Sequence, residues 1–423
     1  MSRTALSQND TNTIEIVRRP ARIAMALGRQ FDLATLSLTT TDPMSSRHGW
    51  ITSEGATTVK LRRTSLVAVI ALAAALGVAA CGSSSPSNAT GSSFSATIDG
   101  SGSTSAAPIY AQWTLNEKSS GLTVNYLADG SGAGVTNLVA KTDAFAGDDP
   151  ALTPADIASF KGAPVLEFPV AAGAYTVSYN LPGVNSGLKL TGPVIAEIFS
   201  GKITKWNNSA ITALNPGVTL PSTAISVIHR SDSAGTTAGF TKYLSDVSAT
   251  WKKTIGTGKL VTWPVGTGAP KNAGVAAAVK ATVGAVGYVE QAYALENNFT
   301  YAAIKNSAGN WELPTIASTS AAFSGLAVPA DLGVSTINSP DPQAYPIVSQ
   351  TFLDVYQDPC KDGGLNANEA KGLYDFLTYA LNAGQKTMGS ASGDLPYAPL
   401  PAALQAKDEA QLATMTCNGK SLA

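Results

Sequence analysis

The sequence has 423 residues, of which 13% are charged, and its formal net charge is −1. A chain of this length can form two or three domains, and a nearly neutral balance gives no basic field for nucleic acid. With two histidines and three cysteines, it contains neither a multi-histidine metal site nor a zinc cluster. The many glycines and prolines, 39 and 23, indicate frequent turns.

The first segment with a clear pattern is VKLRRTSLVAVIALAAALGVAAC, from Val59 to Cys81. Basic residues come first, an apolar run from Leu66 to Ala80 follows, and a cysteine ends the segment. The apolar run is short for a membrane span and has the flanks of an export signal. Its final VAAC resembles the bacterial lipobox, in which cleavage leaves a lipidated cysteine. The alternative is a plain transmembrane anchor with an incidental cysteine.

The residues on either side of this segment have different expected roles. Because export signals stand at the start of a chain, we expect residues 1–58 to be an over-long start or a disordered leader. Residues 82–94 begin with GSSSPSNATGSS and predict a flexible tether. This order predicts a protein anchored by lipid to the cell membrane on its extracytoplasmic side, either periplasmic or at the outer surface.

Short apolar runs and stretches of helical periodicity alternate along the rest of the chain. We expect strands at residues 122–128, 164–180, 224–230 and 284–290. We expect helices at residues 106–120, 191–201, 236–247 and 369–384. This alternation predicts α/β domains. The turn-rich stretches at residues 180–193 and 337–346 predict crossings between two lobes.

Four segments combine glycine, hydroxyl and charged residues: GSGSTSAAP, ADGSGAGV, FAGDDPALT and HRSDSAGTT. Three of them precede or begin a predicted helix, whose first backbone N–H groups lack partners and attract an anion. Each segment alone also fits an ordinary structure. The glycine–serine runs can be caps or turns, Arg230 and Asp232 can be a surface pair, and Asp148 and Asp149 can form a solvated turn in which Asp149 caps a helix starting at Pro150.

Together these motifs, with GKITKWNN and GAVGYVEQAYA, resemble the substrate-binding protein of the phosphate-specific ABC transporter, the PstS family. They are spread in order from about residue 95 to residue 390. The resemblance implies a two-lobed α/β periplasmic-binding-protein fold of the class II type, each lobe a mixed sheet flanked by helices, closing over one phosphate. It implies lobe 1 at residues 95–172 and 344–423, and lobe 2 at residues 173–343.

Carried over by motif, the resemblance implies a set of phosphate-binding residues: Thr104, Ser105, Ser131, Asp149, Arg230, Asp232, Ala234, Gly235 and Thr236. Two of these depart from the family. Ala234 stands where a serine is usual, so only its backbone N–H is expected to remain as a donor. Ser105 stands where an aromatic residue is common, so its backbone N–H is the expected contact.

The chemistry of these residues favours phosphate over sulfate. Phosphate near neutral pH carries at least one proton, which the carboxylate of Asp149 can accept in a hydrogen bond, whereas sulfate offers only lone pairs. We expect Asp232 to hold the guanidinium of Arg230 in a fixed fork and to neutralise part of its charge. Uncharged donors then make most of the remaining contacts.

The predicted function is a lipid-anchored, monomeric receptor that binds inorganic phosphate and delivers it to the permease and ATPase subunits of an ABC importer. The alternatives are a receptor for sulfate or molybdate, and an adhesin or signalling protein that keeps the fold. An enzyme is not expected, because a serine hydrolase would depend on His229, which lies on a predicted strand, and no nucleophile elbow is present. The sequence predicts no cofactor and no metal.

The two remaining cysteines are Cys360 and Cys417. Because exported proteins fold in oxidising surroundings, we expect these two to form a disulfide. The alternative is a pair of buried free thiols.

Overall fold

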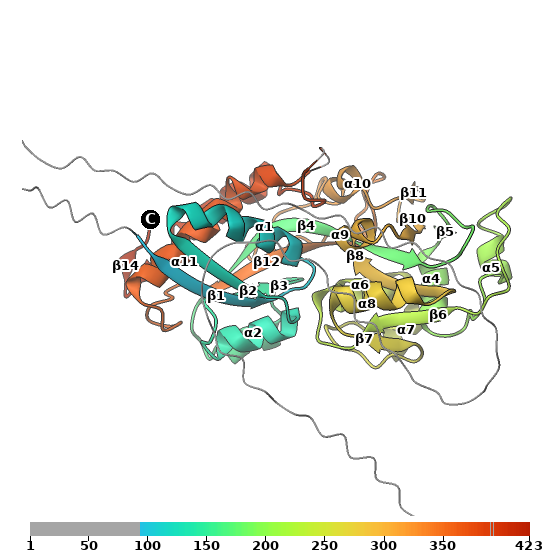
Figure 1. Cartoon of the computed structure of the whole chain (residues 1–423), viewed down its shortest axis with the longest axis horizontal. Helices are drawn as coiled ribbons and strands as arrows, with labels where there is room; N and C mark the ends of the chain where they lie inside the picture. The colour runs from blue at the N-terminus through green and yellow to red at the C-terminus, as the bar shows by residue number, and fades with distance from the viewer. Residues whose placement is uncertain (1–93, 390, 392) are drawn as a thin grey trace, which may run out of the picture. The chain divides into compact units, whose positions relative to one another are not determined.

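The structure is a computed structural model that describes residues 94–389, 391 and 393–423 (Figure 1). The chain divides into two units, and every described residue belongs to the second. The expected leader, the export signal with Cys81 and nearly all of the tether lie outside the described residues. Within the described part of the chain, no helix has the length and apolar character needed to cross a membrane.

Nine strands form one mixed sheet in the order β2-β1-β3-β12-β4-β8-β6-β7, with β9 paired to β4. Their bounds are β1 (Ala96–Gly102), β2 (Leu122–Leu127), β3 (Phe145–Asp148), β4 (Val165–Tyr179), β6 (Ser226–Arg230), β7 (Thr267–Ala269), β8 (Ala285–Glu290), β9 (Thr300–Tyr301) and β12 (Val348–Tyr356). Two small sheets contain β5 (Lys189–Leu190), β10 (Ala303–Lys305) and β11 (Trp311–Glu312), and β13 (Thr416–Cys417) and β14 (Lys420–Ser421).

Strand β4 belongs to both halves of the large sheet. Its first part, up to Ala174, is antiparallel to β12, and its last part, from Tyr175, is antiparallel to β8. Every residue from Phe168 to Tyr179 is buried, which explains the long apolar run in the sequence. Because β3 runs parallel to β4 while β6 runs antiparallel to it, the carboxyl ends of β3 and β6 point toward the middle of β4 from opposite sides.

The expected α/β class with a mixed sheet is confirmed. We propose that the two lobes meet where β4 changes its partner between Ala174 and Tyr175, close to the boundary that the sequence predicts after residue 172. The return crossing is then the chain just before β12, which begins at Val348.

Twelve α-helices and two 3₁₀ helices lie among the described residues. They are α1 (Ala107–Glu117), α2 (Ser131–Val139), α3 (Pro154–Ser159), α4 (Gly192–Phe199), α5 (Ser209–Thr212), α6 (Gly235–Val247), α7 (Ala249–Thr254), α8 (Lys271–Ala281), α9 (Gln291–Glu296), α10 (Ile316–Ala321), α11 (Ala367–Leu381), α12 (Ala402–Leu412), η1 (Lys118–Ser120) and η2 (Gly384–Thr387). Helices α1 and α11 lie on one side of strands β1–β3, and α2 lies on the other (Figure 1).

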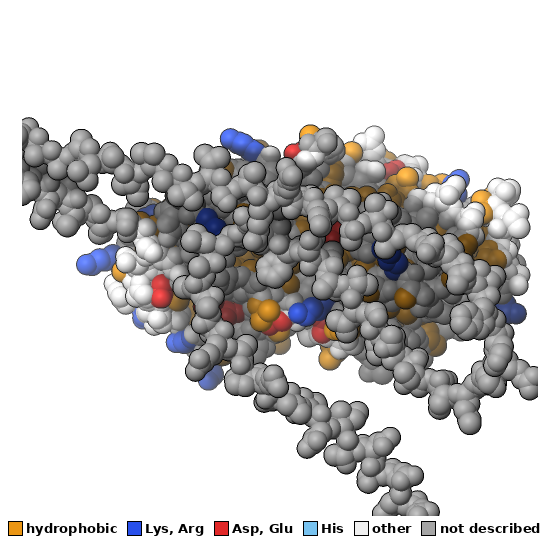
Figure 2. Space-filling view, in the orientation of Figure 1, with side chains coloured by type: hydrophobic (Ala, Val, Ile, Leu, Met, Phe, Trp, Pro, Cys, Tyr) orange, Lys and Arg blue, Asp and Glu red, His pale blue; other side chains and the backbone are white. Residues whose placement is uncertain are grey.

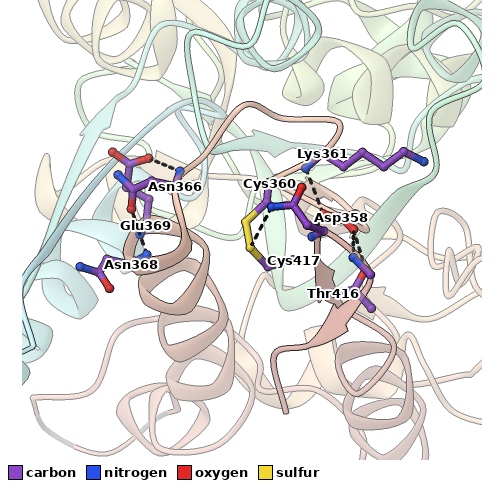
Figure 3. Close-up of a disulfide and its surroundings, with 10 residues drawn as sticks. Asp358, Cys360, Lys361, Asn366, Asn368, Glu369, Thr416 and Cys417 are labelled. Atoms are coloured by element: carbon purple, nitrogen blue, oxygen red, sulfur yellow. Dashed lines mark hydrogen bonds between the residues drawn. A yellow bond between two sulfur atoms is a disulfide. The ribbon is translucent and has the colours of Figure 1, made fainter.

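Local sequence explains where the longest of these helices begins. The side chain of Asn366 accepts hydrogen bonds from the backbone N–H of Glu369 at 3.0 Å and from that of Asn368, and the Glu369 carboxylate accepts the N–H of Asn366 (Figure 3). This capping box starts α11. Leu373, Phe376 and their neighbours at helical spacing are then buried against the sheet.

The second half of the sheet packs around a group of aromatic rings. Phe240 of α6 stacks on Tyr288 of β8 with ring centroids 4.4 Å apart. His229, on β6, stacks on Trp263 at 4.8 Å, and its Nδ1 lies 2.9 Å from the carbonyl oxygen of Arg230. Burial lowers the pKa of His229, so the neutral ring donates to that carbonyl and contributes to packing.

The expected disulfide between Cys360 and Cys417 is confirmed, with the two Cα atoms 4.9 Å apart (Figure 3). The alternative of two free thiols is therefore wrong. Beside it, the Asp358 carboxylate accepts hydrogen bonds from the backbone N–H of Asn418 and Gly419, at 2.9 and 2.8 Å. The disulfide and this carboxylate fasten the carboxyl-terminal hairpin to the chain that follows β12.

Where side chains are visible in Figure 2, positive and negative ones are few and form no large patch of one sign. Blue and red side chains are scattered among orange and white ones outside the grey region. This dispersed pattern agrees with the low charged fraction of the sequence, 13%.

A buried carboxyl group on α12 makes stability depend on pH. Asp408 lies between Leu404 and Leu412 on the buried face of the helix, and neither of its carboxylate oxygens has a hydrogen-bond partner in the described part of the chain. Burial raises the pKa of Asp408 from 3.8 to about 8. The folded protein therefore holds this proton more tightly than the unfolded chain, and its contribution to stability falls as pH rises between these two values.

We predict that Asp408→Asn raises the Tm at pH 8 by about 3 °C or more and changes it much less at pH 5. The neutral amide removes the cost of ionising a buried group. Thermal unfolding at the two pH values measures this, with Glu296→Gln, at an exposed carboxylate, as the control. Equal shifts at both pH values would show that ionisation of Asp408 is not the cause.

Candidate anion-binding site

The four sequence segments predicted to bind an anion come together at the carboxyl ends of strands. Thr104 follows β1, Ser131 follows β2, Asp149 follows β3 and Arg230 ends β6. These ends meet near the middle of β4, which brings distant parts of the chain to one place. Ligands of α/β sheets bind at such carboxyl ends.

Asp149 accepts hydrogen bonds from two serine hydroxyls. Ser103 Oγ donates to Oδ1 at 2.8 Å and lies 3.0 Å from Oδ2, and Ser105 Oγ donates to Oδ2 at 3.2 Å. Asp149 is 1% exposed, and burial raises its pKa. The following helix, α3, begins at Pro154 after the cap Thr153, so the alternative in which Asp149 caps a helix starting at Pro150 is wrong.

Ser103 was not among the predicted site residues, and it corrects one expectation. Its Oγ accepts the backbone N–H of Ser105 at 3.1 Å and that of Ala106 at 3.2 Å. The Ser105 amide is thus used inside its own loop, and the hydroxyl of Ser105 points to Asp149 instead. The sequence offers several adjacent hydroxyls here and does not tell which one faces the carboxylate.

Arg230 is 2% exposed, so the alternative of a surface pair with Asp232 is wrong. Its Nε donates to Asp232 Oδ1 at 2.8 Å, its Nη2 donates to Oδ2 at 2.5 Å, and its Nη1 donates to Thr236 Oγ1 at 2.8 Å. Burial alone would raise the pKa of Asp232, but the bonds and charge of Arg230 outweigh it and lower that pKa. The expected fork between the two residues is present.

Two helices begin here without a side-chain cap. Helix α2 begins at Ser131 after Gly130, and α6 begins at Gly235 after Ala234. The hydroxyl of Ser131 is buried and has no hydrogen-bond partner among the described residues. The amides of Gly132 and Ala133 donate to the carbonyl oxygens of Ser233 and Gly130, so α2 offers the amide and hydroxyl of Ser131, at the positive end of its dipole. A buried donor without a partner is costly, which indicates that a ligand completes this site.

The amide of Ala234 corrects a second expectation. It donates to the carbonyl oxygen of Lys259 at 2.8 Å and is therefore occupied by the protein itself. The side chain of Ala234 is buried, with 1% exposed. The free donors of α6 begin one residue later, at Gly235.

Glycines let the two sides of the site approach closely. A Cβ on Gly235 would lie 2.4 Å from Asp149 Oδ2 and 2.0 Å from the Asp149 carbonyl oxygen. Gly130 has φ +110°, and a Cβ there would lie 2.9 Å from the Ser233 carbonyl oxygen. The start of α6 therefore rests directly against Asp149, and the start of α2 rests against the loop after β6.

Similarity to known proteins agrees with this geometry. Residues 86–383 match the model of the PBP superfamily domain. The phosphate-binding protein PstS of Pasteurella multocida is 39% identical over 332 residues, which cover 77% of this chain and 93% of that protein. PstS3 of Mycobacterium bovis is 35% identical over 371 residues, covering 81% and 96% of the two chains.

The chain belongs to the PstS family of phosphate-binding proteins.

Solved structures show the same fold for this PstS chain at lower identity. A periplasmic phosphate-binding protein, PfluDING, bound with phosphate has a TM-score of 0.59 and 22% identity, and the match covers 74% of this chain and 93% of that one. A human phosphate binding apolipoprotein has a TM-score of 0.61 and 22% identity, with 76% and 99% covered. The expected two-lobed periplasmic-binding-protein fold is therefore confirmed.

Several residues around the PstS site were not foreseen from the sequence. Thr104 Oγ1 accepts Nδ2 of Asn272 at 2.9 Å, and the Thr104 carbonyl accepts the Tyr293 hydroxyl at 2.8 Å. Lys259 lies 2.6 Å from Asp148, whose pKa burial raises to about 7 in spite of that cation. The run GTGAPKNAG, which spans β7 and the first turn of α8, contains a turn signal that could have pointed to Asn272.

A cavity of about 320 Å³ lies beside the PstS site and is separate from it. Pro150 and Ala151, just after Asp149, line one wall, and Ala238 and Gly239 of α6 line another. Thr104, Asp149 and Arg230 are buried and do not line this cavity. The closed arrangement of donors, and not the open cavity, is the candidate site.

Proposed function

We propose that this chain is an extracytoplasmic receptor that binds inorganic phosphate and delivers it to an ABC importer. The observation that carries the proposal is the buried Ser131 hydroxyl without a partner, at the uncapped start of α2. Arg230, at the end of β6, lies beside Gly130 at this helix start, and Asp149 rests against Gly235 at the start of α6. A tetrahedral oxyanion satisfies such convergent donors, and the relatives named above are phosphate-binding proteins.

The proposed ligand contacts follow from which groups remain free to bind. Direct contacts come from Thr104, Ser131, Asp149, Arg230, Gly235 and Thr236. Asp232 holds the guanidinium, and Ser105 and Ala234 position the loops through the bonds described above. Arg230 supplies one positive charge that Asp232 partly neutralises, so neutral donors make most of the contacts.

Selection of phosphate over sulfate depends on Asp149, the one carboxylate among the proposed ligand contacts. A protonated phosphate oxygen donates to the ionised carboxylate of Asp149, and sulfate has no proton to donate there. Because burial raises the pKa of Asp149, acidic pH protonates it and removes this acceptor. We therefore propose phosphate as the ligand, and we propose that the protein binds it without chemical turnover.

We predict that Asp149→Asn weakens phosphate binding about tenfold and reduces discrimination against sulfate by at least as much. The amide presents a donor where the carboxylate presents an acceptor. Calorimetric titration of both anions at pH 7 measures the two affinities, with Asp246→Asn, in an exposed pair with Lys242, as the control. Unchanged selectivity would remove Asp149 from this role, and wild-type protein that binds no phosphate would overturn the proposed function.

We also propose that the protein is a monomer held to the membrane by lipid on Cys81. The basic, apolar and cysteine-ended order of residues 59–81 supports the anchor. Mass spectrometry of protein extracted from membranes detects the lipid, and light scattering of the phosphate-bound protein gives the mass. An unmodified Cys81 peptide from membrane-bound protein would contradict the anchor.

A further inference from the structure

We infer that Asn272 is a positioning residue for phosphate binding, because it orients the hydroxyl hydrogen of Thr104 toward the anion. The inference rests on the proposed function, since it assumes that phosphate is the ligand. Asn272 itself does not contact the ligand. It acts through Thr104, which lies on the other side of the site.

The two residues come from opposite halves of the sheet. Thr104 lies in the loop between β1 and α1 and is 3% exposed. Asn272 is the second residue of α8, which packs on β6 and β8, and it is 0% exposed. They are 168 residues apart in the sequence, so their contact depends on the two halves being closed against each other.

The orientation of the Asn272 side chain is determined by a second contact. Its Oδ1 accepts the backbone N–H of Glu290, at the end of β8, at 3.1 Å. An N–H can only donate, so the oxygen of the amide must face Glu290 and its nitrogen must face Thr104. The Nδ2 group then donates to Thr104 Oγ1 at 2.9 Å, and the Asn272 backbone N–H lies 3.4 Å from the same atom.

These contacts leave the Thr104 hydroxyl free only to donate a hydrogen bond. A hydroxyl oxygen accepts two hydrogen bonds and donates one. Both acceptor positions of Thr104 Oγ1 face N–H groups of Asn272, and within the described residues no hydrogen bond takes its hydrogen. Tyr293 holds the Thr104 carbonyl at 2.8 Å and so fixes the loop. The hydroxyl is left as a donor, which suits an oxyanion oxygen.

Thr236 shows the same arrangement on the second half of the sheet. Its Oγ1 accepts Nη1 of Arg230 at 2.8 Å, and a guanidinium can only donate. Both threonine hydroxyls are therefore available as donors, and the Asp149 carboxylate is the acceptor of the site. Asn272 donates to the Thr104 hydroxyl oxygen as Arg230 donates to that of Thr236, but Asn272 adds no charge to the site. The pattern matches an oxyanion that carries one proton.

A double-mutant cycle with Thr104→Val tests the inference by calorimetric titration with inorganic phosphate. We expect Asn272→Ala to weaken binding about tenfold, the effect of losing one oriented hydrogen bond. We expect Thr104→Val to weaken it by a similar factor, and Asn272→Ala to have less than about twofold further effect in the Thr104→Val background. Asn382→Ala, at the exposed end of α11, is the matched control.

A second variant keeps the test decisive if Asn272→Ala does not fold. Asn272→Asp keeps the acceptor for Glu290 but presents an oxygen to Thr104, so the hydroxyl turns away from the anion. We expect this variant to weaken binding about a hundredfold, because the new carboxylate also repels the ligand. Affinity equal to wild type, or independent effects of Thr104→Val and Asn272→Ala, overturns the inference. Wild-type protein that does not bind phosphate overturns the proposed function instead.

Discussion

Replacing Arg230 with alanine is expected to lower phosphate affinity at least about a hundredfold, since a lost charge-assisted bond and an unpaired acid act together. The guanidinium is buried, makes two bonds to Asp232 and sets the Thr236 hydroxyl as a donor. Without it, the ionised carboxylate of Asp232 faces the anion with no positive partner. The pKa of Asp232 rises in this variant, because the bonds that lower it are gone.

Two further variants separate the loss of the Arg230 bond from the effect of the unpaired Asp232 carboxylate. Arg230→Ala with Asp232→Asn removes the unpaired carboxylate, so the double variant should bind phosphate more tightly than Arg230→Ala alone. Arg230→Lys keeps the charge but loses the fork, and an intermediate affinity is expected. Calorimetry at fixed pH and salt measures all three, and Lys371→Ala, in an exposed ion pair, is the control. Arg230→Ala binding within about threefold of wild type would exclude Arg230 from the site.

The four strands expected from the sequence match strands of the structure to within two residues at each end, whereas β1, β3 and β12 were not foreseen. The expected strands at 164–180 and 284–290 correspond to Val165–Tyr179 and Ala285–Glu290. These strands are buried and apolar over most of their length, so composition alone defines them. Two-residue strands such as β5 and β9 are too short to show any periodicity, and they depend on pairing with distant chain.

In the site, too, contacts between residues close in the sequence are predictable, and contacts between distant residues are not. Arg230 and Asp232 are two residues apart, and their fork is predictable from that spacing. Asn272 and Tyr293 reach Thr104 across 168 and 189 residues, and no local pattern encodes such a contact. The amide of Ala234 was misjudged for the same reason, because its acceptor is the carbonyl of Lys259 in a later loop.

The second large expected effect concerns stability. The disulfide between Cys360 and Cys417 closes a segment of 57 residues. Restricting an unfolded chain with a loop of this length contributes about 4 kcal/mol. We predict that replacing both cysteines with serine lowers the free energy of unfolding by about this amount. Urea unfolding of the double variant measures the loss, and reduced wild-type protein should show a similar one.

The folded hairpin should persist in this variant. The Asp358 carboxylate still accepts the backbone N–H of Lys361 at 3.0 Å and the hydroxyl of Thr416 at 3.0 Å (Figure 3). The loss is therefore expected to come mainly from the unfolded chain, and the denaturant dependence of unfolding should steepen as that chain expands. Unchanged stability of both the double variant and the reduced protein would contradict the prediction.

Phosphate affinity distinguishes the cysteine double variant from Arg230→Ala. In the antiparallel pairing of β3 with β12, Asp148 lies opposite Phe352, so the chain that continues past Tyr356 to Cys360 leads away from Asp149. The cysteine variant should bind phosphate with wild-type affinity. Added phosphate then raises the stability of the variant and of wild type by the same increment, which depends only on ligand concentration and Kd. In Arg230→Ala, by contrast, saturating phosphate should raise the stability by about 2.7 kcal/mol less than in wild type, the free-energy equivalent of a hundredfold weaker Kd.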